Sequence, residues 1–348
     1  MPLCGTYIIW EGVSLPTNRR MSVDSRTVSQ LYCNSFAAVI TMNPIITTDD
    51  LTKKFDQITA VDHLSLSVRQ GEMFGIVGPD GAGKTTSFRM LVGVLLPTSG
   101  TAEILSFDLI KESKKIKREI GYLSQRFSLY GDLSVDENIE FFAEINEVYD
   151  YKERREELLA FTRLMPFRTR LAEQLSGGMK QKLALACTLI HHPKILFLDE
   201  PTTGVDPVSR RDFWKILSSL LKENITIIMS TPYLDEAERC SRVALMNQGK
   251  VMVVDTPQNV KTLMRGEVIE VVCEPIREAF KLLKGHPLLI DVQAFGDRLN
   301  IIMRNSKRDF SAVESMLRER KIHLSESRLI SPSLENVFIS LLSQQEAA

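Results

Sequence analysis

The chain has no apolar run long enough to cross a membrane and no excess of charge of either sign. None of its hydrophobic stretches approaches the roughly 20 residues that a membrane-spanning helix needs. Its 43 Lys and Arg residues nearly balance 44 Asp and Glu, and the net charge of −1 differs from the basic excess of a general nucleic-acid binder. We therefore expect neither a membrane span nor a nucleic-acid partner.

Cysteine is also scarce, with five residues in the chain and no metal-ligand spacing among them. An odd number of scattered cysteines is typical of reduced thiols in an intracellular protein. In contrast, 44% of the residues are hydrophobic, which suffices for a large core and a smaller second domain. The composition therefore predicts a soluble intracellular protein. The cysteines are Cys4, Cys33, Cys187, Cys240 and Cys273.

A glycine-rich turn lies between the apolar strand 73–77 and a helical stretch over 84–95. This order of strand, loop and helix is the context that a phosphate-binding loop requires. Glycines let backbone N–H groups converge on phosphate oxygens, and the helix N-terminus adds partial positive charge. Lys84 is expected to reach the β- and γ-phosphates, and the Thr85 hydroxyl to ligate Mg²⁺. The predicted nucleotide contacts are Gly78, Pro79, Asp80, Gly81, Ala82, Gly83, Lys84, Thr85 and Thr86.

A second apolar strand, 195–198, ends in two carboxylates. Four apolar residues without alternation are typical of a buried parallel strand. Asp199 lies where a carboxylate would hold Mg²⁺, and Glu200 beside it would polarise an attacking water. The alternative is a core strand whose acidic end is merely solvated.

Another glycine turn opens the helix that continues to Ile190, and its sequence is Leu175-Ser-Gly-Gly-Met-Lys-Gln181. With these motifs the chain resembles the ATP-binding subunits of ABC transporters, especially those of drug-resistance and other ABC-2-type exporters. The resemblance runs from about Ile45 to the C-terminus, and this second turn, which matches the ABC signature, is its most specific element. It implies ATP and Mg²⁺ as cofactors, ATP hydrolysis coupled to transport, and a membrane permease as partner.

The family also implies a dimer in which each ATP lies between the phosphate loop of one subunit and the signature turn of the other. Ser176, Gly177 and Gly178 would therefore contact the ATP of a second ATPase chain, in a homodimer or a heterodimer. By the same resemblance, Gln125 would sense Mg²⁺ and contact the permease, and Asp206 would cross the dimer interface. Phe55 would stack on adenine, with ordinary packing as the alternative.

One position departs from the family pattern. After the strand 225–229, where the family usually has a histidine that contacts the γ-phosphate, this chain has Pro232. Proline has no side-chain donor and no backbone N–H. We expect Thr231 to cap the next helix and Pro232 to occupy its first position, so that the backbone course is kept while the catalytic contact is lost. ATP binding should survive, and hydrolysis at this chain's own site is in doubt.

The predicted fold is α/β: a phosphate-loop, RecA-like ABC ATPase core with a helical insert and a small C-terminal α+β domain. The ATPase domain is expected over 45–256, with the insert at about 126–180. Within the insert, the charged segment 151–164 is either a solvated helix face or a contact with the membrane subunit. The order β-α-β-β-α-β beyond residue 265 suggests a ferredoxin-like accessory or regulatory domain over 265–348. Residues 1–41 show no sustained period and no signal-peptide core, so we expect them to be poorly ordered or not normally made.

The function predicted from these features is an ATP-binding and hydrolysing subunit that energises an ABC-2-type exporter from the cytoplasmic face of the cell membrane. The chain resembles the first half of tandem two-ATPase exporters. One alternative is a non-hydrolysing, ATP-binding subunit that supports a competent partner ATPase, which Pro232 favours. The other is a soluble ABC ATPase of DNA repair or translation, but the sequence has a single cassette and no sustained heptads.

Overall fold

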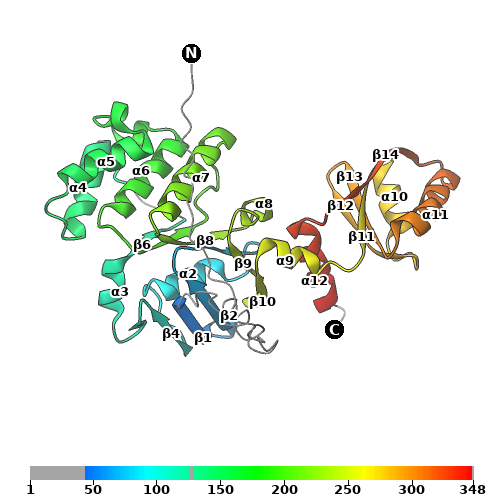
Figure 1. The fold of residues 1–348 in the computed structure, drawn as a ribbon, viewed down its shortest axis with the longest axis horizontal. Helices are drawn as coiled ribbons and strands as arrows, with labels where there is room; N and C mark the ends of the chain where they lie inside the picture. The colour runs from blue at the N-terminus through cyan, green and yellow to red at the C-terminus, as the bar shows by residue number, and fades with distance from the viewer. Residues whose placement is uncertain (1–43, 126–128, 347–348) are drawn as a thin grey trace, which may run out of the picture. The chain divides into compact units, whose positions relative to one another are not determined.

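A computed structural model describes residues 44–125 and 129–346, which form three β-sheets with helices packed on them (Figure 1). The expectation for residues 1–41 and the start of the predicted insert at 126–128 lie outside this part of the chain. Among the described residues, no helix has the length and apolarity of a membrane span.

The central sheet is mostly parallel and has the order β10-β9-β3-β8-β7-β6. Only β10 runs antiparallel to its neighbour, and it follows β9 through the two-residue turn Gln248-Gly249. Both turn residues have positive φ, as the hairpin turns of the I′ type require. The strands are β3 (Met73–Val77), β6 (Ile120–Leu123), β7 (Ile195–Asp199), β8 (Thr226–Thr231), β9 (Arg242–Asn247) and β10 (Lys250–Asp255).

Two apolar layers enclose the central sheet, because its strands are hydrophobic on both faces. On one face, Phe74 and Phe197 pack with a second, antiparallel sheet of order β2-β1-β4-β5 and with α2 (Lys84–Leu91). On the other face, Leu196 and Leu198 pack with the long helices α6 (Gly177–Leu189) and α7 (Pro207–Lys222). The second sheet consists of β1 (Pro44–Phe55), β2 (Ile58–Arg69), β4 (Ser99–Ile104) and β5 (Phe107–Asp108).

Between β6 and α6 the chain is helical, as the sequence predicts, although its helices are shorter than expected. A capping box of Ser134 and Glu137 fixes the start of α4, where each side chain bonds the backbone N–H of the other. The helix α5 ends at Arg163, whose left-handed backbone closes the last turn. The helices and 3₁₀ turns of this region are α4 (Val135–Ile145), α5 (Lys152–Thr162), η1 (Met165–Phe167) and η2 (Ala172–Gln174), while α3 (Ser113–Glu119) precedes β6.

The C-terminal part has the element order β11-α10-β12-β13-α11-β14 that the sequence suggests, in an antiparallel sheet of order β12-β13-β11-β14. The helix α11 begins four residues earlier than expected, because Asn305 caps it by accepting a hydrogen bond from the backbone N–H of Arg308. Its elements are β11 (Glu267–Glu274), α10 (Ile276–Leu283), β12 (Leu289–Phe295), β13 (Arg298–Met303), α11 (Ser306–Glu319) and β14 (His323–Ile330).

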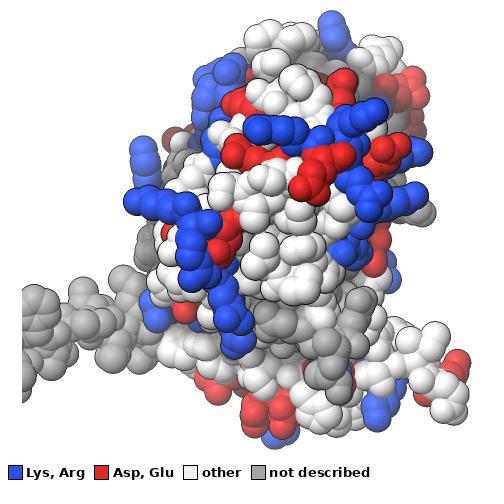
Figure 2. Space-filling view, turned by 90° about the vertical axis from the view of Figure 1, so that its right-hand side faces the viewer, with Lys and Arg blue, Asp and Glu red and all other residues white. Residues whose placement is uncertain are grey.

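Charges of both signs are interspersed on the face shown in Figure 2. On the sheet of the C-terminal part, Glu270 pairs with Arg298 at 2.5 Å and with Arg328 at 2.7 Å, so two guanidinium groups share one carboxylate.

A final helix, α12 (Leu334–Glu346), was not expected from the sequence. Its residues Leu334 and Val337 belong to the same buried cluster as Val260 of α9 (Pro257–Thr262) and Val268 of β11. Asn336 is fully buried, donates to the Gln293 side chain at 2.8 Å and accepts from Gln293 through its own carbonyl at 3.2 Å. The helix therefore joins the C-terminal sheet to α9 through apolar contacts and one buried amide pair.

Replacing Asn336 by Ala should lower the free energy of unfolding by about 1–3 kcal/mol, because the buried Gln293 Oε1 loses the hydrogen bond that Asn336 Nδ2 donates. The measurement is a urea unfolding curve, with Glu335→Ala on the exposed side of α12 as the control. We expect the control to change stability by less than about 0.5 kcal/mol. Equal midpoints for both variants would show that the amide pair contributes nothing.

Candidate functional site

The carboxyl ends of three parallel strands bring the predicted nucleotide residues together. In register, Val77 of β3 pairs with Thr231 of β8, and Asp199 of β7 pairs with Ser230 of β8. The glycine-rich loop therefore begins beside the strand ends that carry the acidic pair and the loop with Pro232. Ligands of open α/β sheets bind at this edge.

Lys84 and Glu200 face each other across the cleft at this edge. The Lys84 Nζ lies 3.3 Å from Glu200 Oε1 and donates to the carbonyls of Gly78 at 2.8 Å and Pro79 at 3.0 Å. The Lys84 and Glu200 side chains are 4% and 6% exposed, respectively. A phosphate entering here would meet a buried ammonium group that the loop itself holds in place.

The cleft has a volume of about 290 Å³, and eight predicted site residues line it together with one that the sequence did not reveal. The additional residue is Ala60 on β2. Its carbonyl is the closest neighbour of Gly83, where an added Cβ would lie 2.5 Å from it. The predicted lining residues are Asp80, Gly81, Gly83, Lys84, Thr85, Thr86, Gln125 and Glu200.

The remaining loop positions have structural roles. A Cβ added to Gly78 would lie 2.0 Å from the Met246 carbonyl, so only glycine fits there. Ala82 is buried, and its N–H donates to the Pro79 carbonyl at 3.1 Å. These contacts shape the loop without lining the cleft.

Asp199 carries a donor set that fits Mg²⁺. Its Oδ1 accepts from Ser230 Oγ at 2.6 Å and from Thr85 Oγ1 at 3.2 Å, while its buried Oδ2 has no hydrogen-bond partner among the described residues. One carboxylate and one hydroxyl, completed by substrate phosphates and water, is an arrangement that Mg²⁺ commonly adopts. Burial, together with the nearby Asp199 carboxylate, raises the pKa of Tyr122 to about 12. The Tyr122 phenol therefore stays protonated near neutral pH.

Glu200 is held in a backbone conformation that is rare for a non-glycine residue, with φ of 50°. Its N–H donates to the carbonyl of Ser230 at 3.2 Å and to the Ser230 Oγ at 3.0 Å. Its Oε2 accepts from Gln125 Nε2 at 3.0 Å. Strain of this kind persists where the surroundings determine it and is concentrated at functional sites.

Ser230 is a site residue that the sequence analysis missed. It is fully buried and bonds both carboxylate residues at the end of β7. Its Oγ donates to Asp199 Oδ1, and its Oγ and its carbonyl both accept from the Glu200 N–H. The signal was present, because two adjacent polar residues end the apolar strand β8 as Asp199 and Glu200 end β7.

The signature turn lies outside the Lys84 cleft within one chain, beside Asp206 instead. Ser176 caps α6, and a Cβ added to Gly178 would lie 2.3 Å from Ser209 Oγ and 3.6 Å from Asp206 Oδ2. Asp206 caps α7, and hydrogen bonds from Ser209 hold the pKa of Asp206 below its usual range. Gly177 has open space on its Cβ side.

Phe55 ends β1 with 46% of its surface exposed, and it belongs to neither of the buried clusters on the central sheet. Lys53 Nζ lies 5.1 Å from the centre of its ring. The ring is not among the residues that line the cleft, so its contact with adenine stays a prediction.

The loop after β8 corrects one expectation. Thr231 and Pro232 do not form the start of a helix, since α8 (Leu234–Ala237) begins at Leu234 with Tyr233 as its N-cap. Instead, Thr231 Oγ1 accepts from the Tyr233 N–H at 3.0 Å, which makes a tight turn around Pro232. The missing N–H of proline leaves no bond unmade in such a turn.

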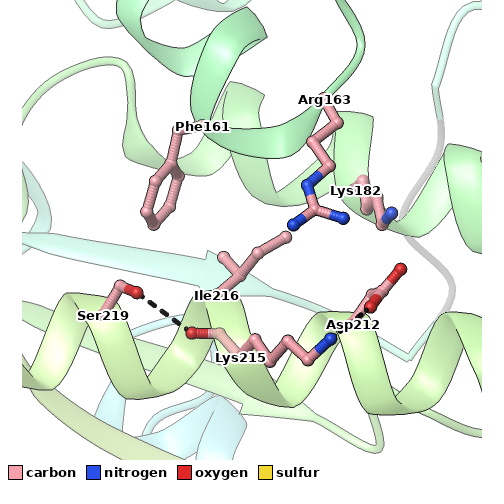
Figure 3. Close-up of a pocket in the computed structure, with 7 residues that line it drawn as sticks. All are labelled: Phe161, Arg163, Lys182, Asp212, Lys215, Ile216 and Ser219. Carbon is pink, nitrogen blue, oxygen red and sulfur yellow. Dashed lines mark hydrogen bonds and ion pairs between the residues drawn. The ribbon is translucent and has the colours of Figure 1, made fainter.

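A second cleft, between α5, α6 and α7, shares no residue with the nucleotide cleft (Figure 3). Its volume is about 130 Å³, and the Arg163 guanidinium points into it. Positive charge is added by Lys182 and by Lys215, which pairs with Asp212 at 3.1 Å. The pKa of Asp212 is lowered by the hydrogen bond from Lys215, and the nearby charges of Lys182 and Arg163 lower it further. Phe161, Ile216 and Ser219 complete its lining.

The comparisons with known proteins agree with this geometry. The family model "ABC transporter" matches residues 61–203. The chain is 33% identical over 303 residues to the daunorubicin resistance ATP-binding protein DrrA3 of Streptomyces coeruleorubidus, covering 85% of this chain and 95% of that protein. The chain belongs to the ATP-binding subunits of ABC transporters, a family of transport ATPases.

Other relatives set the limits of the comparison. The probable multidrug ABC transporter ATP-binding protein YbhF of Escherichia coli is 43% identical over 222 residues, which are 62% of this chain and only 38% of YbhF. Among solved structures, cbiO1 of Clostridium perfringens superposes with a TM-score of 0.58 at 28% identity, over 63% of this chain and 91% of cbiO1. A dimeric ATP-binding cassette, MJ0796 bound to ADP and Pi, superposes with a TM-score of 0.54 at 27% identity, over 61% of this chain and 98% of MJ0796.

Gly83→Ala should weaken ATP binding about tenfold or more, because its φ of 101° and the Ala60 carbonyl leave no room for a methyl group. Gly81→Ala is the matched control, since φ is also positive there but nothing lies within 4 Å of the added Cβ. Equilibrium binding of ATP, with a thermal unfolding curve for each variant, makes the comparison. If both variants bind ATP equally well, the close approach of β2 does not shape the loop.

Proposed function

We propose that this chain binds MgATP in the Lys84 cleft and energises a membrane permease of the ABC-2 exporter type from the cytoplasmic face of the membrane. In this proposal residues 45–256 act as the ATPase domain and 265–348 as an accessory domain. The observation that carries it is the convergence of Lys84, Thr85 and Glu200 on one cleft at the carboxyl ends of parallel strands, with Asp199 bonded to Thr85 beside it.

Each of these residues has a role that its contacts support. Lys84 and the backbone N–H groups of residues 80–86, apart from that of Ala82, would bind the β- and γ-phosphates, and Thr85, Asp199 and Gln125 would hold Mg²⁺. Mg²⁺ bound there would neutralise charge that develops on the phosphates. Glu200, held by Ser230 and bonded to Gln125, would orient and polarise the attacking water.

The dimer supplies the other half of the nucleotide site. Ser176, Gly177 and Gly178 open α6 with free space over Gly177, so they can approach the ATP bound by a second ATPase chain. Asp206 lies beside this turn and would face the same interface. The dimeric solved cassette bound to ADP and Pi has the fold of this chain, which supports a dimer here as well.

Pro232 makes the two sites of such a dimer unequal when the partner retains the histidine. The turn that Thr231 closes around Pro232 keeps the backbone in place, but it offers no donor to a γ-phosphate. This chain would then bind ATP, hydrolyse it slowly in its own cleft, and complete the faster site of its partner. The match to YbhF covers only 38% of that protein, which supports a likeness to one part of a longer ATP-binding protein.

A second function is a regulatory subunit that binds ATP without hydrolysing it, which Pro232 also favours. The two functions predict different effects of a histidine at position 232 on the ATPase rate. For both, the transported substrate would be chosen by the permease.

Lys84→Ala should lower MgATP affinity about 10- to 100-fold, since a charge-assisted bond to phosphate contributes about 1.5–3 kcal/mol. Lys114→Ala, on an exposed helix position, is the control and should bind as the unaltered chain does. Equilibrium binding with a fluorescent ATP analogue gives the result. Unchanged affinity in Lys84→Ala would refute the proposed site.

Pro232→His should raise the ATPase rate of the isolated chain about 10- to 100-fold, because it restores one donor to the γ-phosphate. The added activity should disappear when Glu200→Gln is combined with it. Brisk turnover by the unaltered chain, unaffected by Glu200→Gln, would contradict the impaired-site proposal. No gain from Pro232→His, together with intact ATP binding, would favour the regulatory function.

A further inference from the structure

Glu236 is a buried carboxyl group that neither the cleft nor the predicted motifs use. It lies in α8 and is 1% exposed. Its Oε1 accepts from Thr202 Oγ1 at 2.6 Å, and its Oε2 accepts from Thr231 Oγ1 at 2.9 Å. Both hydroxyl groups belong to loops that border the nucleotide cleft.

The first loop follows Glu200. Thr202 is two residues beyond it, and the next residue, Thr203, donates from its N–H to the Glu200 carbonyl at 3.2 Å and from its Oγ1 to Glu200 Oε2 at 3.4 Å. Anchoring Thr202 therefore fixes the turn that holds the side chain of Glu200.

The second loop contains Pro232. Thr231 Oγ1 accepts from the Tyr233 N–H and donates to Glu236, so one hydroxyl group closes the turn and ties it to α8. Each of these bonds is within 3.0 Å. The position of Pro232 thus depends on the same carboxyl group as the loop after Glu200.

A third element, α7, contacts Glu236 through Arg210. Its Nε lies 3.7 Å from Glu236 Oε1, and its guanidinium group lies over the ring of Tyr233 at 5.2 Å. The Arg210 N–H donates to the carbonyl of Asp206 at 2.9 Å, one turn away at the start of α7. Contacts thus run without a break from Asp206 to both loops.

A purely structural role explains this arrangement poorly. Burying a carboxyl group is costly unless hydrogen bonds compensate, and apolar residues of similar volume are often at least as stabilising in such positions. Here both oxygens bond to residues of two different loops at the cleft, and an arginine approaches from a third element. Such a network determines the relative position of the elements more than it adds stability.

We propose that Glu236 is a positioning residue, which holds the loop after Glu200, the loop with Pro232 and the start of α7 in a fixed relation. A contact made at Asp206 by a second ATPase chain then reaches Glu200 through Arg210 and Glu236. This last step rests on the proposed function; the fixed relation of the two loops does not.

The test uses Glu236→Gln in the full chain, with Asp235→Asn, an exposed acid one position earlier in α8, as the matched control. Hydrogen exchange should become faster in both 200–206 and 231–237, while that of α2 (Lys84–Leu91) stays unchanged. Affinity for MgATP should stay within about threefold, and the single-turnover rate of bound ATP should fall about tenfold, as expected for a misplaced reacting group. Retained affinity separates this result from a failure of the nucleotide site itself.

A double-mutant cycle tests the route from Asp206. The effects of Asp206→Ala and Glu236→Gln on exchange in 200–206 should be non-additive. Additive effects in the cycle would overturn the route from Asp206. Unchanged exchange in both loops, equal loosening by Asp235→Asn, or loss of protection in α2 together with ATP affinity would each overturn the fixed relation of the two loops. The last of these results would assign Glu236 a merely structural role.

Discussion

The bond from Ser230 to Asp199 is the contact on which the arrangement of the site depends. This hydrogen bond joins the ends of β7 and β8 at 2.6 Å, and the Ser230 Oγ also accepts a hydrogen bond from the Glu200 N–H. Because β8 also pairs with β3, the phosphate loop begins at the same sheet edge. Lys84 and Thr85, which come from the loop and the first turn of α2, can then reach two carboxylates that lie more than a hundred residues away in the chain.

The sequence predicted the parts of this site that are local patterns, and it missed those that depend on tertiary contacts. The phosphate loop and the acidic pair were found because strand, loop and helix follow one another. Glu236 was missed because no spacing rule links it to Thr202 across 34 residues, and Ser230 was missed because the polar end of β8 was not compared with that of β7. The requirement for glycine was predicted as well, but its physical reason was incomplete. Gly78 and Gly83 are also required by the carbonyls of Met246 and Ala60, whatever ligand the loop binds.

The loop with Pro232 shows how the backbone after β8 accommodates a proline. The sequence indicated that proline would be tolerated there, and it is, but in a turn and not in a helix. Thr231 satisfies the Tyr233 N–H and bonds Glu236, so the two residues on either side of Pro232 are already held. A substitution at position 232 therefore changes the chemistry offered to the nucleotide more than the course of the chain. The same anchoring explains why the loop stays aligned with Glu200.

The helix α12 determines how any role of the C-terminal part would reach the ATPase core. The sequence analysis did not predict this helix, because 331–338 is a short segment whose apolar partners come from elsewhere in the chain. In the structure, Leu334 and Val337 share one buried cluster with α9 and β11, and Asn336 fixes the helix against β12. Apolar contacts alone tolerate small shifts along a helix, whereas a buried amide pair has one favourable register. A movement of the C-terminal sheet would therefore carry α12 with it and shift α9, which directly follows β10 of the central sheet. The helix α12 is therefore one link between the C-terminal sheet and α9, beside the segment 263–266 that joins α9 to β11 directly.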